Sequence, residues 1–133
     1  MASLISTIRL ALLGIMLMAA LGCKPSAPLK VDAIQLGRSL NPDNTVAIHS
    51  TLFKTTDTVY VSILTPEAGT GNLGVRWIYE GRLVDEPIKP VSYRKAMATT
   101  FHLHNGNGFP PGDYSVEVLV DGEPVGHRAF RVN

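Results

Sequence analysis

Cysteine is nearly absent from this sequence, which has only Cys23 among its 133 residues. No disulfide can form within the chain, so the folded part must be stable through its hydrophobic core alone. Neither sign of charge dominates, since 12 Lys and Arg residues stand against 11 Asp and Glu residues. The net charge of +1 argues against the strongly basic surface that binds nucleic acid. The length fits one domain.

Long apolar runs are also missing, apart from one near the N-terminus. Residues 10–21 are uncharged and mostly apolar, follow Arg9, and lead through small residues to Gly22 and Cys23. A positive region, an apolar stretch and a small-residue site in this order are typical of an export signal. The stretch is shorter than the roughly 20 residues that a helix needs to span a bilayer. We therefore predict a signal peptide over residues 1–22, cleaved between Gly22 and Cys23.

This signal resembles the lipobox of bacterial lipoproteins, in which the cysteine after the cleavage site is diacylated. The resemblance implies that lipid on Cys23 holds the protein on a bacterial membrane, because several acyl chains give a stable anchor. Ala20 stands where that family usually has leucine. Lys24 replaces the aspartate typical of inner-membrane retention, which favours the outer membrane, facing the periplasm or the cell surface. The alternatives are an uncleaved membrane helix and an ordinary secretory signal.

The region after Cys23 divides into a short stalk and a strand-rich domain. Residues 24–30 contain two prolines and small residues, which favour an extended segment, so we predict a lipidated tether over residues 23–30. Leu29 is the position that could instead belong to the first edge of the domain. Residues 31–133 show short alternating apolar runs between Gly, Pro, Asn and Asp, which predict a β-sandwich or barrel of about seven strands.

The expected strands follow these runs. They cover residues 31–36, 46–53, 58–64, 73–79, 97–103, 114–120 and 125–132, and residues 82–84 return antiparallel after a turn at residues 80–81. We also expect turns at residues 41–44, 68–72 and 121–122, which are rich in Gly, Asn and Asp.

Residues 109–116 carry a more specific pattern, a Pro-Gly turn that leads to Tyr114. The pattern resembles the approach to a late strand in immunoglobulin-like and fibronectin-type sandwiches, where a tyrosine hydroxyl bonds back to the preceding loop. The resemblance implies that Trp77 is the core tryptophan, and the closing strand would bury Phe130 and Val132. Paired cysteines of antibody domains are absent. We expect an all-β, immunoglobulin-like antiparallel sandwich.

His102 and His104 are candidate metal ligands, because alternate residues of a strand share a face and imidazole binds zinc, copper or nickel. A tight site needs a further ligand, and the fold would have to bring His49, His127, Glu117 or Met97 close to supply one, although Met97 alternates onto the opposite face of the strand. Two solvated histidines on a strand face are the simpler interpretation. We therefore predict no metal and no cofactor.

Catalytic patterns are missing as well. No serine stands in a nucleophile elbow, and the single thiol is assigned to lipid, so we expect no catalytic residue and no enzyme. The favoured function is a non-catalytic binding or accessory module of the cell envelope, attached to the membrane through Cys23. Its partner would be a protein reached through loops or a sheet edge, and not a nucleic acid. The alternative is a periplasmic metal-binding protein that uses His102 and His104.

Overall fold

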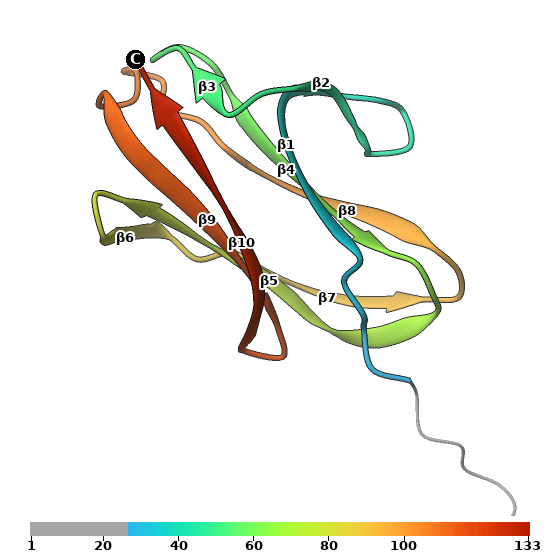
Figure 1. Ribbon diagram of the computed structural model, residues 1–133. Coiled ribbons are helices and arrows are strands. Elements are labelled where there is room, and N and C mark those ends of the chain that lie inside the picture. The colour runs from blue at the N-terminus through green and yellow to red at the C-terminus, as the bar shows by residue number, and fades with distance from the viewer. Residues whose placement is uncertain (1–26) are drawn as a thin grey trace, which may run out of the picture.

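The structure of the chain is a computed structural model that describes residues 27–133. The predicted signal peptide over residues 1–22, Cys23 and the first part of the tether lie outside the described residues. All regular structure in the described part is strand (Figure 1). Its elements are β1 (Ala33–Leu40), β2 (Val46–His49), β3 (Leu52–Phe53), β4 (Val59–Thr65), β5 (Gly69–Tyr79), β6 (Arg82–Asp85), β7 (Ile88–Tyr93), β8 (Met97–Leu103), β9 (Gly112–Val120) and β10 (Glu123–Val132). Residues 27–133 include no helix with the length and apolar character needed to cross a bilayer.

The strands form two sheets. One has the order β2-β1-β4-β8, and the other has the order β3-β10-β9-β5-β6, with β7 also pairing with β5. Neighbouring strands run antiparallel except β3 and β10, which are parallel. The predicted all-β sandwich is thus confirmed, and it has more strands than the seven or so that the sequence predicts.

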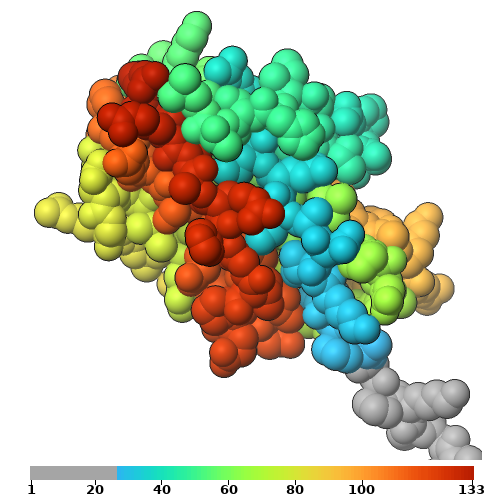
Figure 2. All heavy atoms as spheres, in the orientation of Figure 1, coloured from blue at the N-terminus to red at the C-terminus, as the bar shows by residue number. Residues whose placement is uncertain are grey.

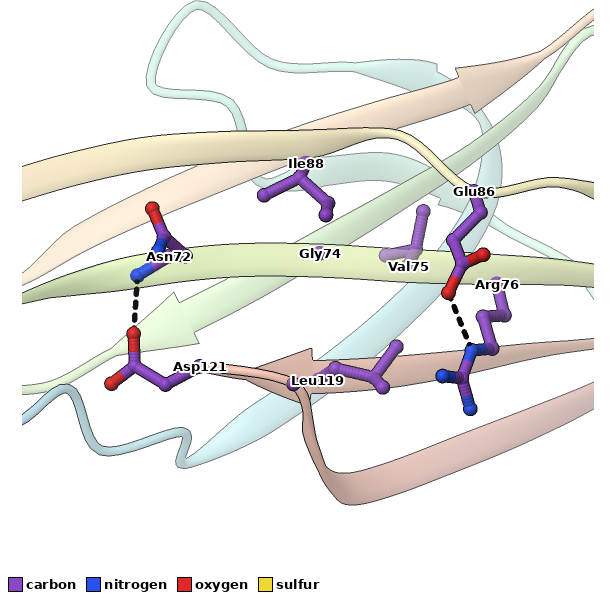
Figure 3. Close-up of a pocket in the computed structure, with 9 residues that line it drawn as sticks. Asn72, Gly74, Val75, Arg76, Glu86, Ile88, Leu119 and Asp121 are labelled. Atoms are coloured by element: carbon purple, nitrogen blue, oxygen red, sulfur yellow. Dashed lines mark hydrogen bonds and ion pairs between the residues drawn. The ribbon is translucent and has the colours of Figure 1, made fainter.

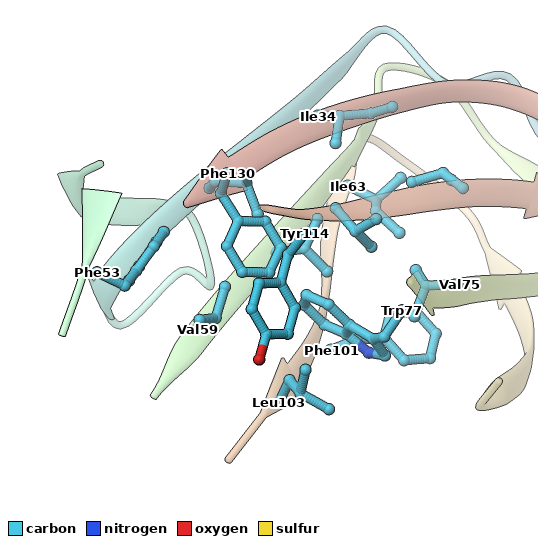
Figure 4. Close-up of a cluster of buried hydrophobic side chains, with 14 of the residues drawn as sticks. Ile34, Phe53, Val59, Ile63, Val75, Trp77, Phe101, Leu103, Tyr114 and Phe130 are labelled. Atoms are coloured by element: carbon cyan, nitrogen blue, oxygen red, sulfur yellow. The ribbon is translucent and has the colours of Figure 1, made fainter. Parts of the chain in front are cut away.

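The core lies between the two sheets and consists of the alternate residues of the strands that face inward (Figure 4). Val59, Val61 and Ile63 of β4 are fully buried, as the period of two predicts. Trp77 of β5 is 0% exposed and packs edge-on against Phe130 of β10, with ring centroids 6.2 Å apart. Trp77 is therefore the core tryptophan, as expected.

The predicted tyrosine corner is present. The Tyr114 hydroxyl donates a hydrogen bond to the Pro110 carbonyl at 2.7 Å, and the Tyr114 ring stacks on Phe130 at 5.2 Å. The predicted hairpin after β9 is also confirmed, since Asp121 (φ 50°) and Gly122 (φ 83°) both have the positive φ of a type I′ turn.

The segment at residues 68–72 is not the turn that its glycines suggest, because Gly69 to Asn72 begin strand β5. The glycines serve close backbone approach instead. A Cβ on Gly69 would lie 2.9 Å from the Pro28 carbonyl oxygen, and Pro28 forms a parallel bridge with Thr70. The missing side chain lets the incoming chain lie against the sheet.

Two further differences concern the edges of the sheets. The sequence predicts no strand between residues 84 and 97, yet β7 lies there and pairs with β5. Its central Pro90 and its mostly exposed residues hide the alternation that marks a strand, but an edge strand tolerates proline. The single strand expected over residues 46–53 is split at Ser50, because the chain crosses there from one sheet to the other.

The start of the domain lies earlier than residue 31. Leu29 is 6% exposed and belongs to the core cluster, so the alternative left open for this residue is correct. The Thr70 amide donates to the Ala27 carbonyl at 2.9 Å, which fixes the chain from residue 27 onward.

One long side of the sandwich is closed where β10 lies against β1. Figure 2 shows the side chains of these strands in contact across that side. The Arg128 Nε donates to the Ile34 carbonyl at 3.2 Å, and Ile34 lies against Gly126. A bulge near Pro124 and Gly126 further interrupts the free edge of β10, which is how natural sheets discourage edge-to-edge pairing.

Candidate functional site: a groove between two sheet edges

The other long side of the sandwich is closed only in part. Where β7 faces β8, the Lys89 ammonium donates to the Thr100 carbonyl at 2.5 Å and lies over the Phe101 ring, 4.6 Å from its centroid. Nearby, the hydroxyls of Tyr93 and Thr99 share a hydrogen bond of 2.5 Å. These contacts tie the two sheet edges together and cover that half of the core.

Where β6 faces the end of β8, a groove of about 260 Å³ opens instead. We call it the distal groove; it is lined by Tyr79, Val84, Leu103, His104, Asn105, Phe109, Pro110 and Tyr114. It lies at the opposite end of β5 from the incoming chain, because Pro28 pairs near the start of that strand and Tyr79 is its last residue. The nine residue steps from Thr70 to Tyr79 along β5, at about 3.3 Å each, separate the two by roughly 30 Å. Figure 1 shows β6 and the described start of the chain at opposite ends of the domain.

Aromatic rings form the rigid wall of the distal groove. The rings of Tyr79 and Tyr114 are 4.6 Å apart, and Phe109 packs edge-on against Tyr114 at 6.0 Å. Both hydroxyls donate to the adjoining loop, Tyr114 to the Pro110 carbonyl and Tyr79 to the Pro111 carbonyl at 3.0 Å. Burial raises the pKa of Tyr114 above its ordinary value, with a smaller effect from nearby Tyr79 and Glu80. The rings are therefore held in place, and the raised pKa keeps the Tyr114 hydroxyl neutral at ordinary pH.

The loop behind this wall is fixed by Glu80 and Gly112. The Glu80 amide donates to the Asp113 carbonyl at 3.0 Å, and the Asp113 amide donates to the Glu80 carboxylate at 2.9 Å. Gly112 has a φ of 145°, and a Cβ there would lie 2.6 Å from a Glu80 oxygen and 2.9 Å from the Tyr79 ring. Only glycine suits both this backbone and this space.

Strand β6 forms the exposed rim of the groove. Leu83 and Val84 are 57% and 51% exposed, and β6 ends its sheet, so its outer edge has no strand partner among residues 27–133. A bulge between β5 and β6 keeps the regular part of this edge short. The rim therefore offers a partner two exposed apolar side chains and a few backbone N–H and C=O groups for hydrogen bonding.

The two candidate metal ligands lie at and beside the groove. Both histidines are exposed; the His104 Nδ1 is 3.2 Å from the Thr58 hydroxyl, and the His102 ring lies against Tyr60, with centroids 6.0 Å apart. Residues 27–133 contain no group of three His, Cys, Asp or Glu side chains arranged to hold one metal ion. The pair thus has no third ligand of these types in the described part, and the metal hypothesis stays a prediction.

A second hollow, of about 200 Å³, lies over the outer face of β5 and β9 (Figure 3). Its charged groups are engaged with one another: Arg76 donates to Glu86 at 2.7 Å and to Glu117 at 3.2 Å. These carboxylates, Glu86 above all, raise the pKa of Arg76. The backbone amide of Asn72 donates to the Asp121 carboxylate at 2.8 Å. Because its charges are already paired, we assign this hollow a structural role.

The comparisons with known proteins support the fold. An immunoglobulin-like protein from Pseudomonas aeruginosa superposes with a TM-score of 0.55 and 11% identity, over 84% of this chain and 100% of that chain. The domain is an immunoglobulin-like sandwich. An alkylpurine DNA glycosylase from Pseudomonas fluorescens, solved bound to DNA with an abasic site analog, superposes with a TM-score of 0.52 and 16% identity. That match covers 80% of this chain and 31% of the glycosylase, so this chain spans about a third of that enzyme's length.

At these identities the similarity concerns the fold alone. No model of a known protein family matches the sequence, and neither does any curated protein sequence.

Proposed function

We propose that this protein is a lipid-anchored, non-catalytic accessory module of a bacterial envelope that binds a protein partner in the distal groove. The observation that carries the proposal is the placement of the groove. It lies about 30 Å along β5 from the point where the chain enters the domain. A partner at that end is free to approach when the entering chain is held at a membrane.

The length of the predicted tether supports this orientation. Cys23 precedes Ala27 by four residues, and Ala27 is already bonded to the domain. Four residues of fully extended chain reach at most about 14 Å. Lipid on Cys23 would therefore keep the body of the domain close to the bilayer, with the distal groove on the side that faces away.

The lining of the groove favours an apolar anchor on the partner. Its walls are the rings of Tyr79, Tyr114 and Phe109 with the aliphatic side chains of Leu103 and Val84. The tyrosine hydroxyls are already engaged as donors. A partner segment that inserts one aliphatic or aromatic side chain and runs beside β6 would bury the exposed Leu83 and Val84 as well.

Site-directed photo-crosslinking in the native envelope tests this proposal. A photoreactive residue at position 84 should give a discrete crosslinked product. The matched control is position 125, because Val125 on β10 is 47% exposed and lies outside the groove. Products of the same size at both positions, or none at position 84, would refute binding through the distal groove.

The anchor has a separate test, mass spectrometry of the mature protein. We expect an N-terminal Cys23 that carries lipid on its sulfur. An unmodified thiol, or a chain that still begins with residues 1–22, would contradict the lipid anchor without affecting the groove.

A further inference from the structure

The loop beside the distal groove contains the chemistry of a spontaneous modification. Residues 105–108 read Asn-Gly-Asn-Gly, and the other asparagines that have a following residue precede Pro42, Thr45 and Leu73. An asparagine before glycine deamidates readily, because glycine leaves the next backbone nitrogen unhindered. The two Asn-Gly sites are chemically alike, so any difference between them must come from the fold.

The structure distinguishes the two sites through their attacking nitrogens. For Asn107 the attacking atom is the Gly108 nitrogen, whose hydrogen is bonded to the Asn105 carbonyl at 2.9 Å, and Gly108 is held at a φ of 85°. For Asn105 the attacking atom is the Gly106 nitrogen. Gly106 is exposed, and within residues 27–133 its amide makes no such turn bond. Attack at Asn107 therefore requires the hydrogen bond of its attacking nitrogen to break, whereas the Gly106 nitrogen has no such bond to break within residues 27–133.

A hydrogen bond also orients the side chain of Asn105 and makes its Cγ atom more electrophilic. Its Oδ1 accepts a hydrogen bond from the backbone amide of Asn107 at 3.0 Å. This bond holds the side-chain amide of Asn105 over the following backbone and draws electron density from the Cγ atom of Asn105. The same donor faces the oxygen that becomes negatively charged when Cγ is attacked.

We infer that Asn105 is a deamidation site of the folded protein and that Asn107 is protected. The Gly106 nitrogen loses its proton to water or a buffer base and bonds to Cγ of Asn105. The bond from Cγ to the side-chain nitrogen breaks, and that nitrogen takes up a proton from the solvent or the buffer acid and leaves as ammonia. The resulting five-membered succinimide is opened by one water molecule. Opening gives aspartate when the ring nitrogen leaves Cγ, and isoaspartate when it leaves the backbone carbonyl carbon.

The product places a negative charge at the distal groove, because Asn105 is one of its lining residues, next to His104. An aspartate has a pKa of about 3.9 and is ionised at neutral pH. An isoaspartate adds a methylene to the main chain and thereby disrupts the turn that Gly108 closes. The modification site itself does not depend on the proposed function. Its consequence for a groove partner does.

The test is to incubate the mature protein at mildly alkaline pH and to follow both positions by fragment-ion mass spectrometry. In the folded protein, deamidation at Asn105 should be several-fold faster than at Asn107. In urea, where the turn is absent, the two rates should become similar. Equal rates in the folded protein, or faster reaction at Asn107, would overturn the inference.

Gly106→Ala provides a matched variant. A Cβ on Gly106 meets no atom within 4 Å, so the variant should fold normally, while its methyl group hinders the attacking nitrogen. The rate at Asn105 should fall strongly, and the rate at Asn107 should stay unchanged. An unchanged rate at Asn105 would show that the Gly106 nitrogen is not the attacking atom.

Discussion

Two tyrosines in the wall of the distal groove allow a controlled measurement of what the tyrosine corner contributes. Each donates its hydroxyl to the carbonyl of a neighbouring proline, but the Tyr114 bond (2.7 Å) is partly buried and the Tyr79 bond (3.0 Å) is exposed. Tyr114→Phe removes one hydrogen bond from a residue that is 5% exposed and should cost about 1 kcal/mol of unfolding free energy. Tyr79→Phe should cost about 0–0.5 kcal/mol, because water can replace both partners of an exposed bond.

Urea unfolding followed by fluorescence measures both losses in one assay. The single tryptophan, Trp77, is fully buried, so its emission reports exposure of the core. For a domain of about 100 residues, 1 kcal/mol lowers the melting temperature by roughly 4–8 °C. Tyr114→Phe should lower the urea midpoint without changing the slope of the transition. If the two variants lose equal stability, or if Tyr114→Phe unfolds like the parent protein, partial burial of the Tyr114 bond is not what makes it stabilising.

Three further predictions follow from the same region. Gly112→Ala should cost about 1–3 kcal/mol, and more than Gly81→Ala, because both glycines have positive φ but only Gly112 would also place a Cβ against other atoms; urea midpoints compare the two. The pKa of Tyr114 is raised in the folded protein from the ordinary 10.0, because burial favours the neutral hydroxyl. The contribution of this neutral hydroxyl to the stability of the fold is complete below pH 10.0 and is lost as the pH rises through the folded pKa. The urea midpoint should therefore fall at alkaline pH, and it should fall less in Tyr114→Phe. Calorimetric titration with zinc should show no tight site, and tight binding that disappears in the His102→Ala/His104→Ala double variant would establish a metal function instead.

Local patterns identify the parts of this fold that local chemistry determines. The alternation of Val59, Val61 and Ile63 predicts a strand with one buried face, and that face is fully buried. The resemblance of residues 109–116 to a tyrosine corner implies a hydroxyl bond from Tyr114 back to the loop, which is present. In both cases the pattern that makes the prediction lies within a few residues of chain.

Features that depend on distant segments are not predicted. Gly69 and its neighbours have the composition of a turn, and only the approach of Pro28 explains why they form a strand. The distal groove combines the ends of β5, β6 and β8 with the loop before β9, so no single stretch of sequence marks it.

The attachment of residues 27–32 to the body has a mechanical consequence. Tension applied to the chain at its described start is borne by the bond from the Thr70 amide to the Ala27 carbonyl, then by buried Leu29, then by the 2.8 Å bond from the Asp32 amide to the Leu64 carbonyl. The first bond lies in the six-stranded sheet and the last in the four-stranded sheet, so the load is shared by both halves of the domain. A force applied at this end must break these contacts of residues 27–32 before it reaches the strand pairs that support the distal groove.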